Sequence, residues 1–179
     1  MDLMAVAQAI EASGIATAIR DSLYAGPLIN VFHVIGMALV FGTISIVDLR
    51  LLGFPSNARS LSAVSHDLLK WTWIGFAVAV VTGTLMFSAN ATTFYINNEF
   101  RLKLVLLVLA GINMLIFELI TARHANLWDK DVPVPFAGKL AGALSLIFWI
   151  SIIFLGRWIG YTKGFNFDVP VDMDFDNLF

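Results

Sequence analysis

Four long apolar stretches, separated by polar segments, dominate the pattern of residues along the chain. The stretches cover residues 28–49, 71–91, 102–122 and 140–161. Each is about 20 residues long, which is the length that a helix needs to cross the hydrocarbon core of a bilayer. The pattern therefore predicts an all-α integral membrane protein, an up-and-down four-helix bundle over residues 28–162. The polar segment that follows the first stretch, up to residue 70, is predicted to be a loop.

Small residues predict one close contact between helices. Gly75, Ala79 and Gly83 recur at every fourth position of the second stretch. Such a row lies on one face of a helix and lets a neighbouring backbone approach closely.

The two ends of the chain differ from the stretches between them. Residues 1–22 repeat apolar residues at helical spacing against charged ones, which predicts an amphipathic helix lying in the membrane interface. This segment lacks the basic start and the unbroken apolar core of a cleaved secretory signal. Residues 163–179 alternate large apolar side chains with acidic ones. They are predicted to form an arm outside the membrane that docks on a partner.

Composition supports the membrane class and narrows the chemistry. The 179 residues are 59% apolar and 13% charged, whereas soluble proteins average roughly 45–50% apolar and about 25% charged. The mean hydropathy is +0.82. Four spans leave no room for a separate soluble catalytic domain, and a net charge of -2 argues against nucleic acid as a partner. Because the chain has no cysteine, any cofactor must be held without thioether or thiolate bonds.

One layer of polar residues inside the apolar stretches is the main candidate site. Counted along antiparallel helices, His33, Met86 and Arg157 lie at the same depth, with Lys103 slightly shallower and Asn30 on the same helical face as His33. This layer would suit haem b, because an imidazole and a thioether can ligate the iron and a guanidinium can pair with a propionate. The alternative is structural: an intramembrane histidine that hydrogen-bonds a neighbouring helix, and a methionine that only packs.

A second polar layer is predicted at the opposite face of the bundle. Its members are charged or titratable residues at or near the ends of the spans: Asp48, Arg50, His66, Lys70, Glu118, Arg123 and His124. Haem ligation by His66 and His124 is possible there, as is a metal site that includes Glu118. Neither spacing matches a known metal signature, so ion pairs and solvated charges at the membrane surface are the favoured interpretation.

Several short motifs together resemble a family of small bacterial four-helix membrane proteins of unknown function, over about residues 15–162. The motifs are Ala18–Leu23, Val31–Thr43, Val47–Gly53, Trp71–Phe76, Phe100–Leu104 and Gly156–Tyr161. The helix from His33 to Arg50 is also similar to the first helix of the copper-resistance D family and of protoporphyrinogen-oxidising membrane haem proteins. The first resemblance implies a multi-pass protein of the bacterial inner membrane. The second implies haem or copper at His33.

The expected function is that of a membrane b-type cytochrome or redox subunit, which carries electrons within a larger bacterial assembly. No catalytic constellation, such as a serine and histidine pair, is apparent, which argues for electron transfer rather than substrate turnover. The sequence does not decide whether the protein is an enzyme. Two alternatives remain: a cofactor-free accessory subunit and, less favoured, an ion or copper permease. The expected partners are lipid and either a second copy of the chain or another membrane subunit. A slight excess of Lys and Arg in the loops after spans one and three predicts periplasmic termini.

Overall fold

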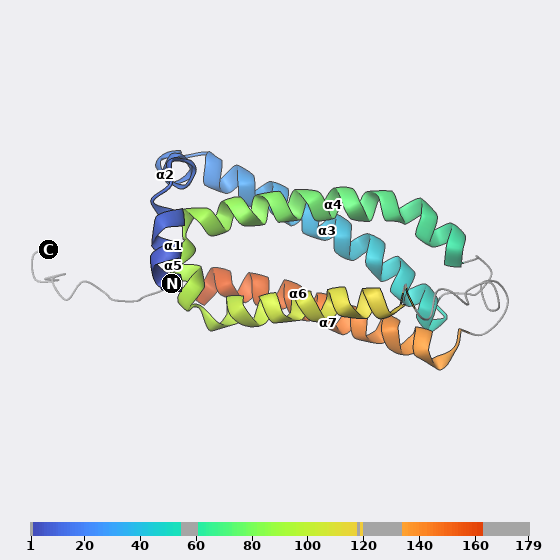
Figure 1. The fold of residues 1–179 in the computed structure, drawn as a ribbon. Coiled ribbons are helices and arrows are strands. Elements are labelled where there is room, and N and C mark those ends of the chain that lie inside the picture. The colour runs from blue at the N-terminus through green and yellow to red at the C-terminus, as the bar shows by residue number, and fades with distance from the viewer. Residues whose placement is uncertain (1, 55–60, 118, 120–133, 163–179) are drawn as a thin grey trace, which may run out of the picture.

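The computed structural model describes residues 2–54, 61–117, 119 and 134–162, and this part of the chain is all-helical (Figure 1). The helices are α1 (Leu3–Glu11), α2 (Gly14–Asp21), α3 (Ala25–Leu52), α4 (Leu61–Ala89), α5 (Ala91–Ile96), α6 (Asn98–Ile116) and α7 (Phe136–Thr162). Three of them contain segments long and apolar enough to cross a membrane, namely Ala25–Leu52, Lys70–Ala89 and Phe136–Tyr161.

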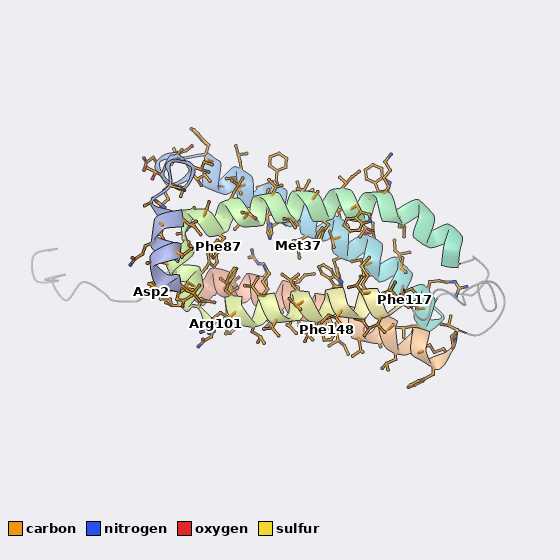
Figure 2. All side chains as sticks on the ribbon, viewed as in Figure 1. Asp2, Met37, Phe87, Arg101, Phe117 and Phe148 are labelled. Carbon is orange, nitrogen blue, oxygen red and sulfur yellow. The ribbon has the colours of Figure 1, made fainter. Side chains whose placement is uncertain are left out.

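The long helices form two hairpins, α3 with α4 and α6 with α7 (Figure 1). The hairpins meet mainly where α3 crosses α7, and α4 packs on α3 rather than on α6. A core cluster of Val40, Ala110, Trp149 and Ile152 fills the region where α3 meets α6 and α7. Met37 and Phe148, both labelled in Figure 2, pack against this cluster. The core thus joins the hairpins through α3 and leaves α4 on the outside.

The α3–α4 contact is made by backbone against backbone. A Cβ atom added to Gly36 would lie 3.0 Å from both the Ala79 nitrogen and the Gly75 oxygen. A Cβ atom on Gly75 would in turn lie 3.0 Å from the Gly36 oxygen. The close contact predicted for Gly75 and Ala79 is therefore present, and its partner is Gly36.

We expect Gly36→Ala to destabilise the protein and Gly42→Ala to leave it equally or more stable. Gly36 has no room for a methyl group, whereas a Cβ atom on Gly42 of the same helix would meet no atom within 4 Å. Overpacking of this kind costs roughly 1–3 kcal/mol, while alanine in place of glycine favours a helix by about 1 kcal/mol. Thermal unfolding of both variants in the same detergent would measure the difference. Equal melting temperatures would contradict the close contact.

The short helices α1, α2 and α5 gather at one end of the hairpins (Figure 1). The carboxylate of Glu11 accepts hydrogen bonds from the backbone nitrogen and the hydroxyl of Thr92, at 2.8 and 2.6 Å. Arg20 donates to the backbone oxygen of Ala89 at 3.0 Å. These bonds tie α1 and α2 to the turn between α4 and α5. Stacked rings of Phe87, Phe94 and Phe100 join α4, α5 and α6 beside that turn.

Several helix boundaries differ from the sequence prediction. The N-terminal segment is two helices, because the Ser13 hydroxyl caps a new helix by accepting from the Ala16 nitrogen at 3.4 Å. Helix α3 begins at Ala25 and includes Pro27, which is tolerated in a first turn because the backbone nitrogens there need no partner inside the helix. Residues 61–70, predicted to be part of a loop, belong to α4, and this segment contains neither glycine nor proline.

Candidate functional site

His33 lies half-buried on α3 with one ring nitrogen held by α4. Its Nδ1 atom is 3.0 Å from the Ala79 carbonyl oxygen and 3.0 Å from the Thr82 hydroxyl oxygen. A carbonyl oxygen can only accept, so Nδ1 must carry the hydrogen. The Thr82 hydroxyl donates its own hydrogen to the Val78 oxygen at 2.6 Å, which leaves it free to accept from His33. In the neutral form of this imidazole, the lone pair therefore lies on Nε2.

Two glycines provide room for the two basic side chains of the site. A Cβ atom added to Gly83 on α4 would lie 3.2 Å from Cε1 of His33. A Cβ atom added to Gly156 on α7 would lie 3.2 Å from Nζ of Lys103. In each hairpin, a basic side chain from the first helix thus lies against a glycine of the second. Any larger residue at either glycine would crowd the group it faces.

His33 and Lys103 come from different hairpins but are brought together. The ammonium group of Lys103 is near enough to act electrostatically on the His33 imidazole. Lys103 is partly buried, and within the described residues no carboxylate forms an ion pair with it. Both groups lie about two helical turns from the core residues Val40 and Ala110, towards the end covered by α1, α2 and α5. The site therefore combines a lone pair and a cation in an apolar region.

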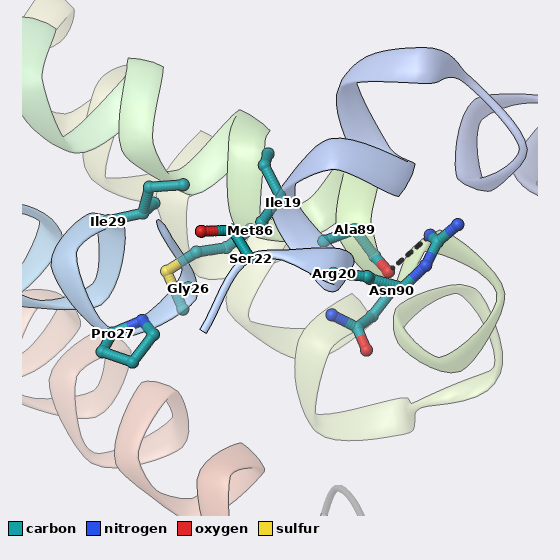
Figure 3. A pocket seen from close by; sticks show the side chains of 9 residues that line it. All are labelled: Ile19, Arg20, Ser22, Gly26, Pro27, Ile29, Met86, Ala89 and Asn90. Carbon is teal, nitrogen blue, oxygen red and sulfur yellow. Dashed lines mark hydrogen bonds between the residues drawn. The ribbon is translucent and has the colours of Figure 1, made fainter. Parts of the chain in front are cut away.

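The other residues predicted for this layer are placed differently. Arg157 and Asn30 are exposed, and the hydrogen bonds of His33 within the described residues go to Ala79 and Thr82 instead. Met86 lines a cavity of about 310 Å³ between the end of α4 and the segment that leads from α2 into α3 (Figure 3). Its neighbours there include Pro27 and Ile29. Of the five residues predicted for this layer, His33 and Lys103 interact electrostatically.

Two members of the second polar layer, Asp48 and Arg50, are buried rather than solvated, whereas Lys70 is exposed. Asp48 and Arg50 are 5% and 4% exposed. They are buried because α3 crosses α7 at this level, where a Cβ atom on Gly142 would lie 3.0 Å from the backbone oxygen of Asp48. Nearby, Asn113 on α6 donates to the Ala141 oxygen on α7 at 3.0 Å.

The alternative metal ligands of that layer cannot be compared with the structure. Glu118, His124 and the side chain of His66 lie outside the described residues. Among the residues that are described, no three His, Asp or Glu side chains form a group that could hold a metal ion.

Four groups that shape the site were not predicted as site residues: the Ala79 carbonyl, the Thr82 hydroxyl, Gly83 and Gly156. Ala79 and Gly83 did belong to the predicted row of small residues. That row indicated a close helix contact, but nothing in it showed that the approach would place a carbonyl oxygen against His33. A hydrogen bond to a backbone atom has no residue-type signature.

The fold and the site define a class of all-helical proteins with membrane-spanning potential and a paired histidine and lysine between two hairpins. The chain belongs to DUF6644, a family of unknown function whose model matches residues 13–162. This match confirms the predicted resemblance to an uncharacterised family. No curated protein and no solved structure matches the chain. The likeness to copper-resistance and protoporphyrinogen-oxidising proteins, and the bacterial origin, stay predictions.

Proposed function

We propose that the protein is a membrane b-type cytochrome or redox subunit that binds haem b at His33. The observation that supports this most strongly is the fixed Nδ1–H of His33, which donates to the Ala79 carbonyl and leaves Nε2 available. Histidines that ligate a metal usually donate their other ring N–H to a carbonyl or carboxylate in this way. The bond sets both the tautomer and the direction of the ring. His33 is thus oriented to ligate a metal before any metal or haem is bound.

The surrounding residues fit a haem group chemically. Haem iron would supply the one-electron redox chemistry, and His33 Nε2 would supply an axial nitrogen. Lys103, on the opposite hairpin, acts electrostatically on the His33 imidazole, so it would either provide a second ligand nitrogen or neutralise a propionate. Gly83 and Gly156 leave room for the His33 and Lys103 side chains themselves. Arg157, one residue beyond Gly156, is a further candidate for a propionate contact.

In the proposed membrane arrangement, α6 crosses the membrane in addition to α3, α4 and α7. The first two turns of α6 contain Glu99, Arg101 and Lys103 and lie near one membrane surface. Helices α1 and α2 lie in that interface, where the exposed Leu3 and Ile15 would enter the lipid. The four spans together form the up-and-down bundle of a bacterial inner-membrane protein, with both termini on the periplasmic side.

The test is an absorption spectrum of the purified protein, made in cells with an adequate haem supply and reduced with dithionite. We expect a Soret band and an alpha band, and extraction by acidic acetone should release the haem because the chain has no cysteine to attach it. A spectrum without these bands would exclude the cytochrome function.

A cofactor-free accessory subunit is the second candidate. It is favoured by the same hydrogen bonds, because the contacts of His33 with Ala79 and Thr82 also fasten α3 to α4. In that case the spectrum would show no haem. Native mass spectrometry after mild extraction would instead show a second copy or a partner subunit, whose association would weaken when residues 164–179 are removed.

A further inference from the structure

A buried carboxyl group at the α3–α7 crossing lacks a partner for one of its oxygens. Asp48 is 5% exposed, and its Oδ2 atom has no hydrogen-bond partner within the part of the chain that the structure describes. Its carboxyl accepts a hydrogen bond from the Ser145 side chain on α7. The hydroxyl oxygen of Ser45, one helical turn earlier on α3, is also buried without a partner there. Two orphan oxygens therefore belong to one small region.

Buried polar atoms without a partner are rare in folded proteins, and each one calls for an explanation. A charged carboxylate would cost several kcal/mol in such surroundings unless a cation neutralised it. Arg50 follows two residues later on α3, a spacing that does not bring two side chains face to face. On α7, Gly142 lies against the Asp48 backbone and Ser145 hydrogen-bonds its carboxyl group, and neither residue carries a charge.

We propose that Asp48 forms a proton-binding site with Ser45 and Ser145, in which the carboxyl holds an exchangeable proton. A proton on Oδ2 turns that atom into a donor to one bridging water molecule, and this water can donate in turn to the Ser45 oxygen, which Oδ2 does not reach directly. One proton and one water molecule thus account for both orphan oxygens. A metal ion fits less well, because hard cations take about six oxygen ligands and the three side chains supply fewer.

This site is separate from the proposed haem site and does not depend on it. Asp48 and His33 are 15 residues apart on α3, which corresponds to roughly 22 Å along the helix. Asp48 is four residues from Leu52, the last residue of α3, or about 6 Å. The proton would therefore exchange with the membrane face at which α3 ends. Intramembrane carboxyl groups placed in this way are the usual elements of proton relays.

The test uses two carbodiimides on the full-length protein in nanodiscs without added sodium. The lipophilic reagent dicyclohexylcarbodiimide modifies protonated carboxyl groups in apolar surroundings, and a water-soluble carbodiimide reaches exposed ones. Peptide mapping should show that the lipophilic reagent labels Asp48 and that the water-soluble reagent labels the exposed Asp21 but not Asp48. Asp48→Asn should lose the label at this position while keeping the one at Asp21.

Three results would overturn the proposal. Asp48 could remain unlabelled by the lipophilic reagent, it could react equally with both reagents, or added sodium could protect it, which would indicate a metal ion instead. If Asp48→Asn does not fold, the comparison with that variant is replaced by infrared spectroscopy of the wild-type protein with isotope-labelled aspartate. A protonated carboxyl band should then shift in D₂O and shift again in Ser145→Ala. The absence of such a band counts against the site.

Discussion

Replacing His33 with alanine is expected to abolish haem binding, so that the purified variant shows no Soret band. The substitution removes the imidazole that would hold the haem iron and that α4 orients through the bonds to Ala79 and Thr82. Thr82→Val should keep the ligand but weaken its orientation, and loss of such a supporting bond typically costs about 10–100-fold in metal affinity. We expect the lower end of that range, since the Ala79 carbonyl remains. Haem content per protein, measured as the pyridine haemochrome, gives both values.

The control for this series is Val34→Ala, which changes the next residue of α3 and is half-exposed at 50%. It should retain full haem content. A further variant, His33→Gly, tests ligation directly, because free imidazole added to the buffer should restore the band by entering the vacated space. A purely structural role for His33 predicts no recovery with imidazole. Unchanged haem content in His33→Ala would show that haem does not bind at His33.

The second large effect is expected at Lys103, where charge and ligation can be separated. If its nitrogen ligates the iron, Lys103→Arg should lose the second ligand and give a high-spin spectrum, because a guanidinium stays protonated and cannot ligate. Lys103→Met should then keep a six-coordinate haem with a higher reduction potential. If Lys103 instead neutralises a propionate, Lys103→Arg should retain the spectrum and Lys103→Met should lose haem. Spectra and redox titrations of the two variants distinguish these roles.

Two glycines on α7 supply the matched control for Lys103. Gly156→Ala should displace the amine, because the new Cβ atom would lie 3.2 Å from Nζ. Gly160→Ala, about one turn further along the same helix, places its Cβ atom where no atom lies within 4 Å and should change nothing. If neither Lys103 variant nor Gly156→Ala alters the haem spectrum, Lys103 has no part in binding.

The sequence indicated the depth of the site residues but not their direction. Each residue advances a helix by about 1.5 Å and turns it by about 100°, so counting residues gives depth well. Arg157 and Gly156 differ little in depth, yet Gly156 lies against Lys103 while Arg157 is exposed. Which side of a helix faces its neighbour is settled by packing, and here the contacts of Gly36 with Gly75 fix it for α3 and α4.

The sequence by itself determined the all-helical class, three of the four predicted helices of membrane-spanning length and membership of the family, because apolar composition and helical periodicity are properties of single segments. Tertiary structure alone decided that His33 meets a carbonyl of α4, that Lys103 faces it from the other hairpin and that Asp48 is buried. Each of these depends on which helices become neighbours and how they are rotated. Contacts between segments far apart in the chain determine the neighbours and the rotation of each helix, and no local sequence pattern predicts these contacts.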